Sequence, residues 1–360
     1  MKKKNVIYNL IIANLSVLLL LLLKRITILK EFINVLLVVI IAPVLFGVFF
    51  FYILRPLDSL FLRKGMKKSR AASLTLIIAA FLLAGIFRYF GTYLFTQGVQ
   101  LIAFINTKFT DESTMRVIDG YMMNESFKGL IQNISDQVIS YITVIISNSK
   151  DIFDAGMMIF SDLLLVILII FFLLKDGEKV KPTILKYIPS KYKKISGEIL
   201  SKSDDVLSTY VIGQAIVALS LASMVFIGYK IIKMPSAVLL SSITFILAFI
   251  PFIGFFISMI IPYMIAIILG PQMILRLSIL VLIAQTLKGR VVVPFIMGRA
   301  MKIHPITDIF LVVGAASIGG ALMAFCIVPI YSILKLILQV LIEQKEIPWY
   351  SNIKSMNNRN

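Results

Sequence analysis

Long runs of apolar residues recur along almost the whole chain, and they restrict its fold more than any other feature. A stretch of about 20 apolar residues can cross the roughly 30 Å hydrocarbon core of a bilayer as a helix. Apolar side chains make up 59% of the 360 residues and charged side chains only 15%, far from the balance of a water-soluble domain. The runs cover residues 6–23, 33–54, 74–95, 157–174, 211–229, 237–250, 252–269, 273–287 and 306–342.

These runs predict an all-α, polytopic helical membrane protein. The alternation of apolar and polar residues that marks the strands of a membrane β-barrel does not occur in them. The first run follows three lysines, as in a signal peptide, but no small-residue cleavage site comes after it, so we expect a retained helix. The sequence leaves open whether residues 237–269 and 273–287 make three crossings, or one crossing and a re-entrant hairpin.

Basic residues cluster in particular loops between the apolar runs. The formal net charge of +18 therefore indicates membrane topology and not nucleic-acid binding. Segments 55–70 and 175–202 are rich in Lys and Arg and are expected in the cytoplasm, whereas segment 96–150 has nearly balanced charges and is expected outside. Both chain termini are then cytoplasmic. Lys24, Arg25 and Lys30 disagree with this topology, because they would lie outside.

Four regions follow from these patterns. Residues 1–95 are expected to form an N-terminal membrane region of three spans, and residues 96–150 an extracytoplasmic amphipathic helical segment. Residues 151–345 form the expected C-terminal transport core with a cytoplasmic basic loop at 175–208, and residues 346–360 a polar cytoplasmic tail. Apolar residues at helical spacing in the outward segment predict either helices packed on one another or on the membrane surface, or an oligomerisation collar. They are Leu130, Ile134, Val138, Tyr141 and Ile145.

The segment QTLKGRVVVPFIMGRAMKIHP, residues 285–305, interrupts the apolar C-terminal half with bases and prolines. In a bilayer, every charge and every freed backbone group needs a partner in the protein, at an interface or in a water-lined cavity. The bases either set the topology or form an electropositive vestibule that attracts anionic or polyhydroxylated solutes. They are Lys288, Arg290, Arg299 and Lys302.

A second interruption, IPFIG at residues 250–254, separates two short apolar runs. Proline removes a backbone donor and glycine permits close approach, so this segment is either the tip of a hairpin or broken helix, or a tight turn between two ordinary spans. Gln214 lies near the start of run 211–229, where a buried amide needs a hydrogen bond to another helix or to water.

Four segments carry a resemblance to a known family. They are FFLLKDGEK at 171–179, YVIGQAI at 210–216, AFIPFIGFFI at 248–257 and VVVPFIMGRAMKIHP at 291–305. In this order, and with the hydropathy profile, they resemble the autoinducer-2 exporter family of bacterial multi-pass permeases, most specifically at Pro294, Gly298, His304 and Pro305. The resemblance implies about eight transmembrane helices in the bacterial cytoplasmic (inner) membrane, with broken or re-entrant elements in the C-terminal half. It also implies export of a small polar solute. The quorum-sensing furanone autoinducer-2 is the signal molecule that members of the family export.

The chain departs from the family pattern where coupling chemistry is expected. The family's Gln-x-x-Glu-x-Asn stretch is represented by Gln285, Lys288 and Arg290, so a base replaces the acid. The resemblance also implies an alternative function, exchange of a monovalent cation for a proton. Such exchange normally needs an intramembrane carboxylate, so the loss of the family's acid weakens this alternative. The remaining candidate carboxylates are Asp308, which could instead cap the following helix, and Asp162.

The residues indicate no enzyme, cofactor or metal site. The chain has no Gly-rich phosphate loop, metal-ligand spacing or nucleophile elbow, and its one histidine either titrates near neutral pH or starts a helix.

The predicted function is export of a small polar solute; the alternatives are a monovalent cation (Na⁺ or Li⁺)/proton antiporter and a non-transport membrane protein linked to sporulation. The expected partners are the lipid bilayer, the solute, H⁺ or Na⁺ as coupling ion, and further copies of the chain. The predicted solute pathway comprises Gln214, Pro251, Gly254, Gln285, Lys288, Arg290, Pro294, Gly298, Arg299, His304 and Asp308.

Overall fold

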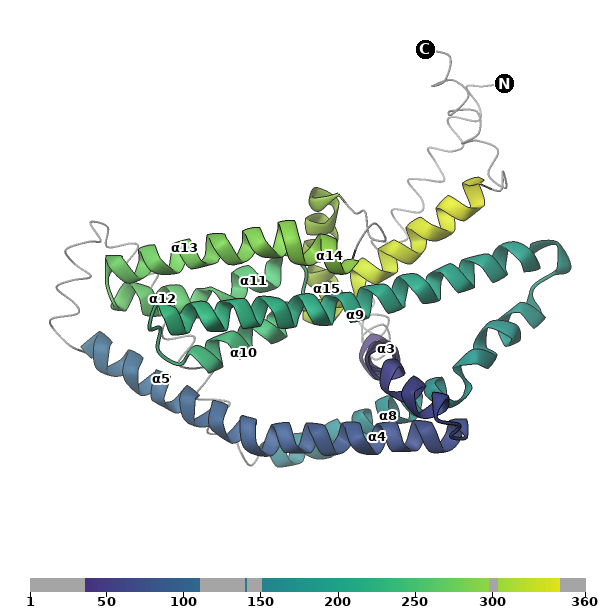
Figure 1. The fold of residues 1–360 in the computed structure, drawn as a ribbon, viewed down its shortest axis with the longest axis horizontal. Coiled ribbons are helices and arrows are strands. Elements are labelled where there is room, and N and C mark those ends of the chain that lie inside the picture. Colours follow the sequence, from purple (N-terminus) through teal and green to yellow (C-terminus); the bar gives the residue numbers. More distant parts are fainter. Residues whose placement is uncertain (1–35, 111–139, 141–150, 298–303, 344–360) are drawn as a thin grey trace, which may run out of the picture.

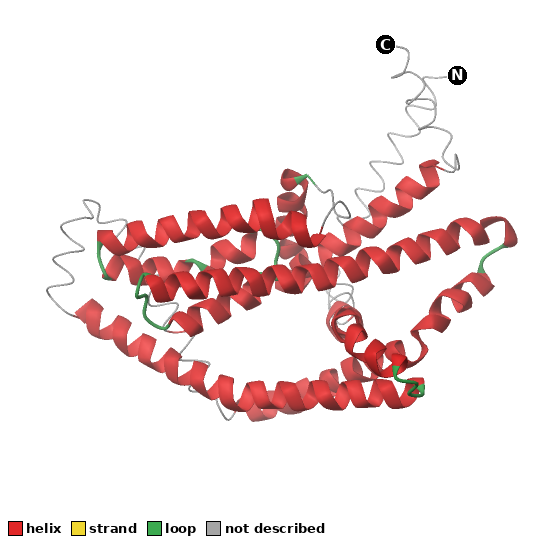
Figure 2. Ribbon diagram, viewed as in Figure 1, coloured by secondary structure: helices red, strands yellow, loops and turns green. Residues whose placement is uncertain are grey.

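The computed structural model describes residues 36–110, 140, 151–297 and 304–343. All regular secondary structure within these ranges is helical (Figures 1 and 2). The prediction of an all-α chain is therefore confirmed. The predicted first span, the apolar stripe at 130–145, the polar tail, and Gly298, Arg299 and Lys302 lie outside the described residues, as does the side chain of Asp162.

The N-terminal half is a group of packed helices. The π-helix η1 (Leu36–Ile41) leads into α3 (Ala42–Arg63), and a turn through Gly65, which has a φ of 83°, leads to α4 (Lys68–Gly85). The π-helix η2 (Ile86–Gly91) joins α4 to α5 (Thr92–Thr110) in one long, bent helical stretch (Figure 1). α8 (Asp151–Tyr187) packs against α3 and α4, where Gly47 lets the side chain of Ile169 approach the α3 backbone.

The C-terminal half is built around the 39-residue helix α9 (Lys193–Ile231), which the short helix η3 (Ser190–Tyr192) connects to α8. Residues 175–208, the predicted basic loop, are thus mostly the helical ends of α8 and α9. The following helices are α10 (Ala237–Leu247), α11 (Ile253–Ser258), α12 (Ile260–Ile268), α13 (Pro271–Leu287), the π-helix η4 (Lys288–Val292), α14 (Val293–Met297) and α15 (Pro305–Glu343).

Five stretches of helix in the described ranges are long and apolar enough to cross a membrane. They are Val39–Arg63, Lys68–Leu101, Ser190–Ile231, Pro271–Met297 and Met323–Ile342. α10 has 11 residues and therefore spans only about 16 Å, about half of the hydrocarbon core. Its length favours the re-entrant alternative for this part of the chain. α15 likewise divides at Gly319 and Gly320, whose backbone angles are not helical.

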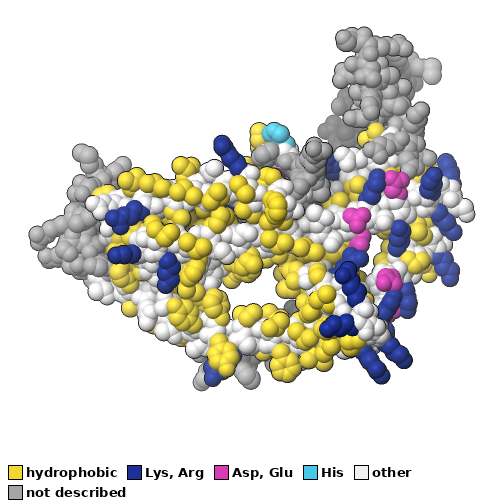
Figure 3. All heavy atoms as spheres, in the orientation of Figure 1, with side chains coloured by type: hydrophobic (Ala, Val, Ile, Leu, Met, Phe, Trp, Pro, Cys, Tyr) yellow, Lys and Arg dark blue, Asp and Glu magenta, His cyan; other side chains and the backbone are white. Residues whose placement is uncertain are grey.

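On the face shown in Figure 3, apolar side chains cover much of the described helices, and the acidic side chains and most of the Lys and Arg side chains gather at one end, with fewer Lys and Arg side chains elsewhere. At that end α3 turns into α4 and α8 leads toward α9. An apolar exterior is stable against lipid tails but not against water. Large exposed apolar side chains include Phe81, Leu82, Leu282, Phe295, Phe310 and Ile318.

Aromatic packing joins the two halves. Phe49 of α3 meets Phe249, in the turn after α10, and Phe325 of α15, with ring centroids 5.6 Å and 5.0 Å away in edge-to-face geometry. Such pairs contribute about 0.5–1.5 kcal/mol beyond the burial of their area. Tyr210 and Val312 are buried in the same cluster. The N-terminal helices therefore support the region where the C-terminal helices are interrupted.

Candidate functional site

The turn between α10 and α11 contains the predicted interruption at Pro251 and Gly254. Phe252 adopts a φ of 56° and a ψ of −63°, and a positive φ is uncommon for a residue with a side chain. The Gly254 amide donates to the Ile250 carbonyl at 3.2 Å, and a Cβ atom at Gly254 would overlap the carbonyl oxygen of Leu247. The segment is thus the tip of a tight hairpin between two short helices, one of the two arrangements expected from the sequence.

Gln214 connects α9 to this hairpin. Its buried side-chain Nε2 donates to the carbonyl oxygen of Ala248 at 2.7 Å, directly after the last residue of α10. The carbonyls at the end of a helix have no partner within it, so this hydrogen bond satisfies one of them inside the membrane region. The bond agrees with the helix-to-helix interpretation of Gln214.

We expect the Gln214→Leu variant to be less stable than the wild type by about 1 kcal/mol, because hydrogen bonds between membrane helices are individually modest. The measurement is the melting temperature of the purified protein in detergent, together with solute flux in proteoliposomes. A small drop in melting temperature with flux retained supports a positioning role. Loss of flux at an unchanged melting temperature would instead show that the amide contacts the solute.

The helix continues into the interruption predicted at residues 285–305. Residues from Pro271 to Met297 form a single apolar stretch, in which Lys288 begins the π-helical segment η4 and Pro294 is the second residue of α14. Gln285 lies on the last turn of α13 and is half-buried, Lys288 is also half-buried, and Arg290 is exposed. A π-helical turn is rare and often marks a functional position. The interruption thus changes the helical winding of this stretch and does not break it before Met297.

Three polar side chains from three helices lie near one another beside η4. Asp308, in the first turn of α15, is close enough to interact electrostatically with Lys288 and with Tyr210 of α9. The Tyr210 hydroxyl oxygen and the Asp308 Oδ1 atom are buried and have no hydrogen-bond partner among the described residues. Unpaired polar atoms in a low-dielectric interior are costly and are a common mark of a ligand or water site.

His304, the residue before α15, has a structural role that differs from that of this cluster. Its side chain is exposed, and its Nδ1 atom accepts a long hydrogen bond of 3.4 Å from the amide of Ile306. Its carbonyl oxygen accepts from the Asp308 amide at 3.1 Å. Both interactions fit a residue at the start of α15, which agrees with the structural interpretation of His304.

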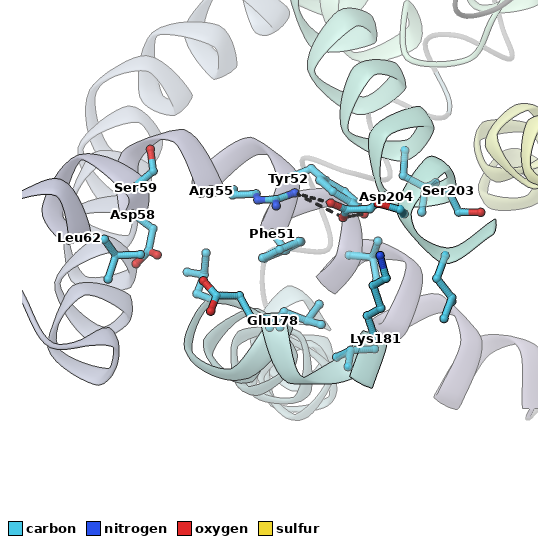
Figure 4. Close-up of a pocket in the computed structure, with 18 residues that line it drawn as sticks. Phe51, Tyr52, Arg55, Asp58, Ser59, Leu62, Glu178, Lys181, Ser203 and Asp204 are labelled. Atoms are coloured by element: carbon cyan, nitrogen blue, oxygen red, sulfur yellow. Dashed lines mark hydrogen bonds and ion pairs between the residues drawn. The ribbon is translucent and has the colours of Figure 1, made fainter. Parts of the chain in front are cut away.

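A second polar site lies where α3, α8 and α9 meet at the charged end of the molecule (Figure 4). The Tyr52 hydroxyl donates to Asp204 Oδ1 at 2.8 Å, and an Arg55 guanidinium nitrogen donates to Asp204 Oδ2 at 3.0 Å. None of these residues was predicted as a site residue. The only signal in the sequence was Asp58, the single acid in the basic segment 55–70.

An ion pair between α4 and α8 borders this second site. Lys68 hydrogen-bonds to Glu178 and thereby lowers the pKa of the Glu178 carboxyl. A carboxyl whose pKa is lower in the folded state stabilises the fold above its unfolded pKa, and this contribution disappears as the pH falls through the folded pKa. Both side chains are largely exposed, so the contribution is below about 1 kcal/mol.

We therefore expect the Glu178→Gln variant to melt at a slightly lower temperature than the wild type at neutral pH, and the difference to vanish in acid. The measurement is the melting temperature of both proteins over a pH series. Asp205→Asn is the control, because Asp205 is exposed and forms no ion pair in the described part of the chain. A difference that grows toward low pH would contradict the assignment.

The apolar exterior, the short and broken helices and the buried polar cluster define a multi-pass membrane protein with a polar site among interrupted helices. A family model, the AI-2E family transporter model, matches residues 10–343, so the chain belongs to the AI-2E transporter family. The resemblance seen in the sequence is thereby confirmed, and the name of the family classes its members as transporters.

Individual relatives agree with this assignment. The chain is 30% identical over 219 residues to YueF of Bacillus subtilis, a match that covers 60% of this chain and 59% of YueF. It is 28% identical over 170 residues to YrrI of Bacillus subtilis, covering 47% of this chain and 48% of YrrI. For MJ1177 of Methanocaldococcus jannaschii the identity is 28% over 159 residues, covering 43% and 47%. The matches therefore span about half to three fifths of these relatives, whose names class them as transport proteins and state no solute.

Proposed function

We propose that the protein exports a small polar solute across the bacterial cytoplasmic membrane, and that the solute passes the polar cluster of Tyr210, Lys288 and Asp308. The observation that carries the proposal is a pair of buried atoms, the Tyr210 hydroxyl and Asp308 Oδ1, which have no hydrogen-bond partner within the ranges that the structure describes and lie beside the α10–α11 hairpin and η4. A hydroxylated solute supplies both a donor and an acceptor for such groups. The autoinducer-2 furanone, which is small and polyhydroxylated, is the first candidate.

Short helices around a polar site suit transport for a physical reason. Broken helices in the bilayer expose backbone groups that can bind a solute, and their ends can move without unfolding a whole span. Here the hairpin tip at Pro251 and Gly254 and the non-helical pair Gly319 and Gly320 supply two such breaks.

Reconstitution into proteoliposomes tests the proposal. Flux of the furanone and of a panel of small polyols is measured with and without a proton or a sodium gradient. We expect saturable furanone flux that is at least tenfold above that of empty liposomes, and a gradient dependence that identifies the coupling ion. Furanone flux equal to that of empty liposomes would reject this solute.

Exchange of Na⁺ or Li⁺ for H⁺ is a second candidate, which Asp308 favours because it is a carboxylate beside a half-buried lysine. Growth of a deletion strain in alkaline sodium or lithium medium separates the two. An antiporter predicts sensitivity of that strain, whereas unaltered tolerance counts against antiport. A role in sporulation without transport predicts a phenotype that survives substitution of all three polar residues in the cluster.

A further inference from the structure

A cavity of about 610 Å³ lies between α3, α8 and α9 at the charged end of the molecule. This volume is in the range of small-molecule sites, which measure about 300–1,000 Å³. Phe51, Leu174 and Leu207 contribute apolar walls, and Asp58, Glu178 and Asp204 contribute carboxylates from the three helices. In Figure 4, Asp58 and Glu178 extend from α3 and α8 into the space between these helices.

Asp58 is the unusual group in this cavity. Its side chain is buried, with 4% of the residue's surface exposed, and the one hydrogen bond that it forms within the described part of the chain is a long one of 3.4 Å from the Thr75 hydroxyl. It has no ion-pair partner among the described residues. A buried carboxylate is costly unless a cation or several donors compensate it.

The other charged groups of the cavity are already compensated or reach water. Asp204 is paired with Arg55, and Glu178 is paired with Lys68 of α4. Lys181 is exposed, so its ammonium group can be solvated at the cavity mouth. The charge that remains for a ligand to neutralise inside the cavity is therefore the negative charge of Asp58.

The backbone near Asp58 adds a second acceptor. Pro56 lies inside α3 and has no amide hydrogen, so the Tyr52 carbonyl lacks the donor that an unbroken helix would give it. The hydroxyl of Ser59 donates to the Pro56 carbonyl at 2.7 Å and keeps its oxygen lone pairs for another donor. This part of the wall therefore offers acceptors to a ligand that has several N–H donors.

We propose that this cavity binds a small organic ammonium ion, with the ammonium group at Asp58 and an apolar body against the walls formed by Phe51, Leu174 and Leu207. An ammonium ion supplies three donors and one positive charge, which match a carboxylate with acceptors beside it. The proposal does not depend on the solute that crosses the membrane, because it concerns binding at a separate site.

The test is calorimetric titration of the full-length protein in phosphatidylcholine nanodiscs, with empty nanodiscs as the blank. The probes are cyclohexylammonium, its neutral analogue cyclohexanol and its anionic analogue cyclohexanecarboxylate. We expect saturable binding of one cyclohexylammonium ion per chain, at least tenfold tighter than binding of either analogue. Wild-type heats equal to those of empty nanodiscs, or tighter binding of the carboxylate, would overturn the proposal.

Three variants locate the site. Asp58→Asn keeps the side-chain shape and the oxygen that accepts from Thr75, but removes the charge, and we expect it to weaken cyclohexylammonium binding at least tenfold. Ser59→Lys places an ammonium group inside the cavity and is expected to have the same effect, which keeps the test decisive if Asp58→Asn does not fold. Asp205→Asn is the control, because Asp205 lies on the same turn of α9 as Asp204 but outside the cavity. Its affinity for cyclohexylammonium should be within twofold of the wild-type affinity. Unchanged affinity in a folded Asp58→Asn or Ser59→Lys protein would reject the site.

Discussion

Replacement of Gly254 with alanine is expected to destabilise the protein by about 3 kcal/mol or more and to abolish transport. The added Cβ atom would overlap the carbonyl oxygen of Leu247, which is backbone and cannot rotate away as a flexible side chain can. Relief requires α11 to move away from α10. That movement would break the hydrogen bond from the Gly254 amide to Ile250, and it would disturb Ala248, which accepts from Gln214.

The measurement for Gly254 is the melting temperature of the purified variant together with the yield of monodisperse protein on size exclusion. Gly314→Ala is the matched control, because a Cβ atom at Gly314 of α15 meets no atom within 4 Å. We expect this control to melt at or above the wild-type temperature, since alanine favours helix. Equal melting temperatures for the two variants would show that the hairpin tip is not closely packed.

Single substitutions of Lys288 and Asp308 are each expected to cost more than the two together. Asp308→Asn leaves a half-buried ammonium group without its carboxylate, and Lys288→Met leaves a carboxyl with a buried oxygen and no counter-charge. The two groups form no ion pair within 4 Å in the described part of the chain, but each charge partly compensates the other in a low-dielectric environment, so removing one leaves the other uncompensated and removing both does not. We expect a coupling free energy of about 1–3 kcal/mol in the double-mutant cycle.

The same variants test the proposed pathway. Furanone flux should fall at least tenfold in Asp308→Asn and stay low in the double variant Lys288→Met/Asp308→Asn, although the double variant regains stability. Arg290→Met is the control, because Arg290 lies on η4 two residues from Lys288 but is exposed. Additive effects of the two single substitutions on stability would show that Lys288 and Asp308 do not interact. Full flux in a stable double variant would remove the cluster from the solute path.

Several local features could be predicted from the sequence because they depend on residues close in the chain. Pro251 and Gly254 predicted either the tip of a hairpin or broken helix, or a tight turn, because proline fixes φ and removes an amide donor whereas glycine permits close approach, whatever surrounds them. The continuation of the helix through Lys288 was not predicted, since a charge and a proline in an apolar run were interpreted as a break. A π-helical turn accommodates them within one helix, and its winding has no simple sequence pattern.

The sequence by itself determined that the chain is an all-helical membrane protein of the AI-2E transporter family. Both the apolar runs and the family's segments consist of consecutive residues, so neither depends on the tertiary structure. Only the tertiary structure decided which polar groups meet. Tyr210, Lys288 and Asp308 come from three helices, and Asp58 shares its cavity with residues of α8 and α9. The physical reason is that a charge in the membrane interior is governed by its neighbours in space, and these neighbours are separated from it by tens to more than a hundred residues along the chain.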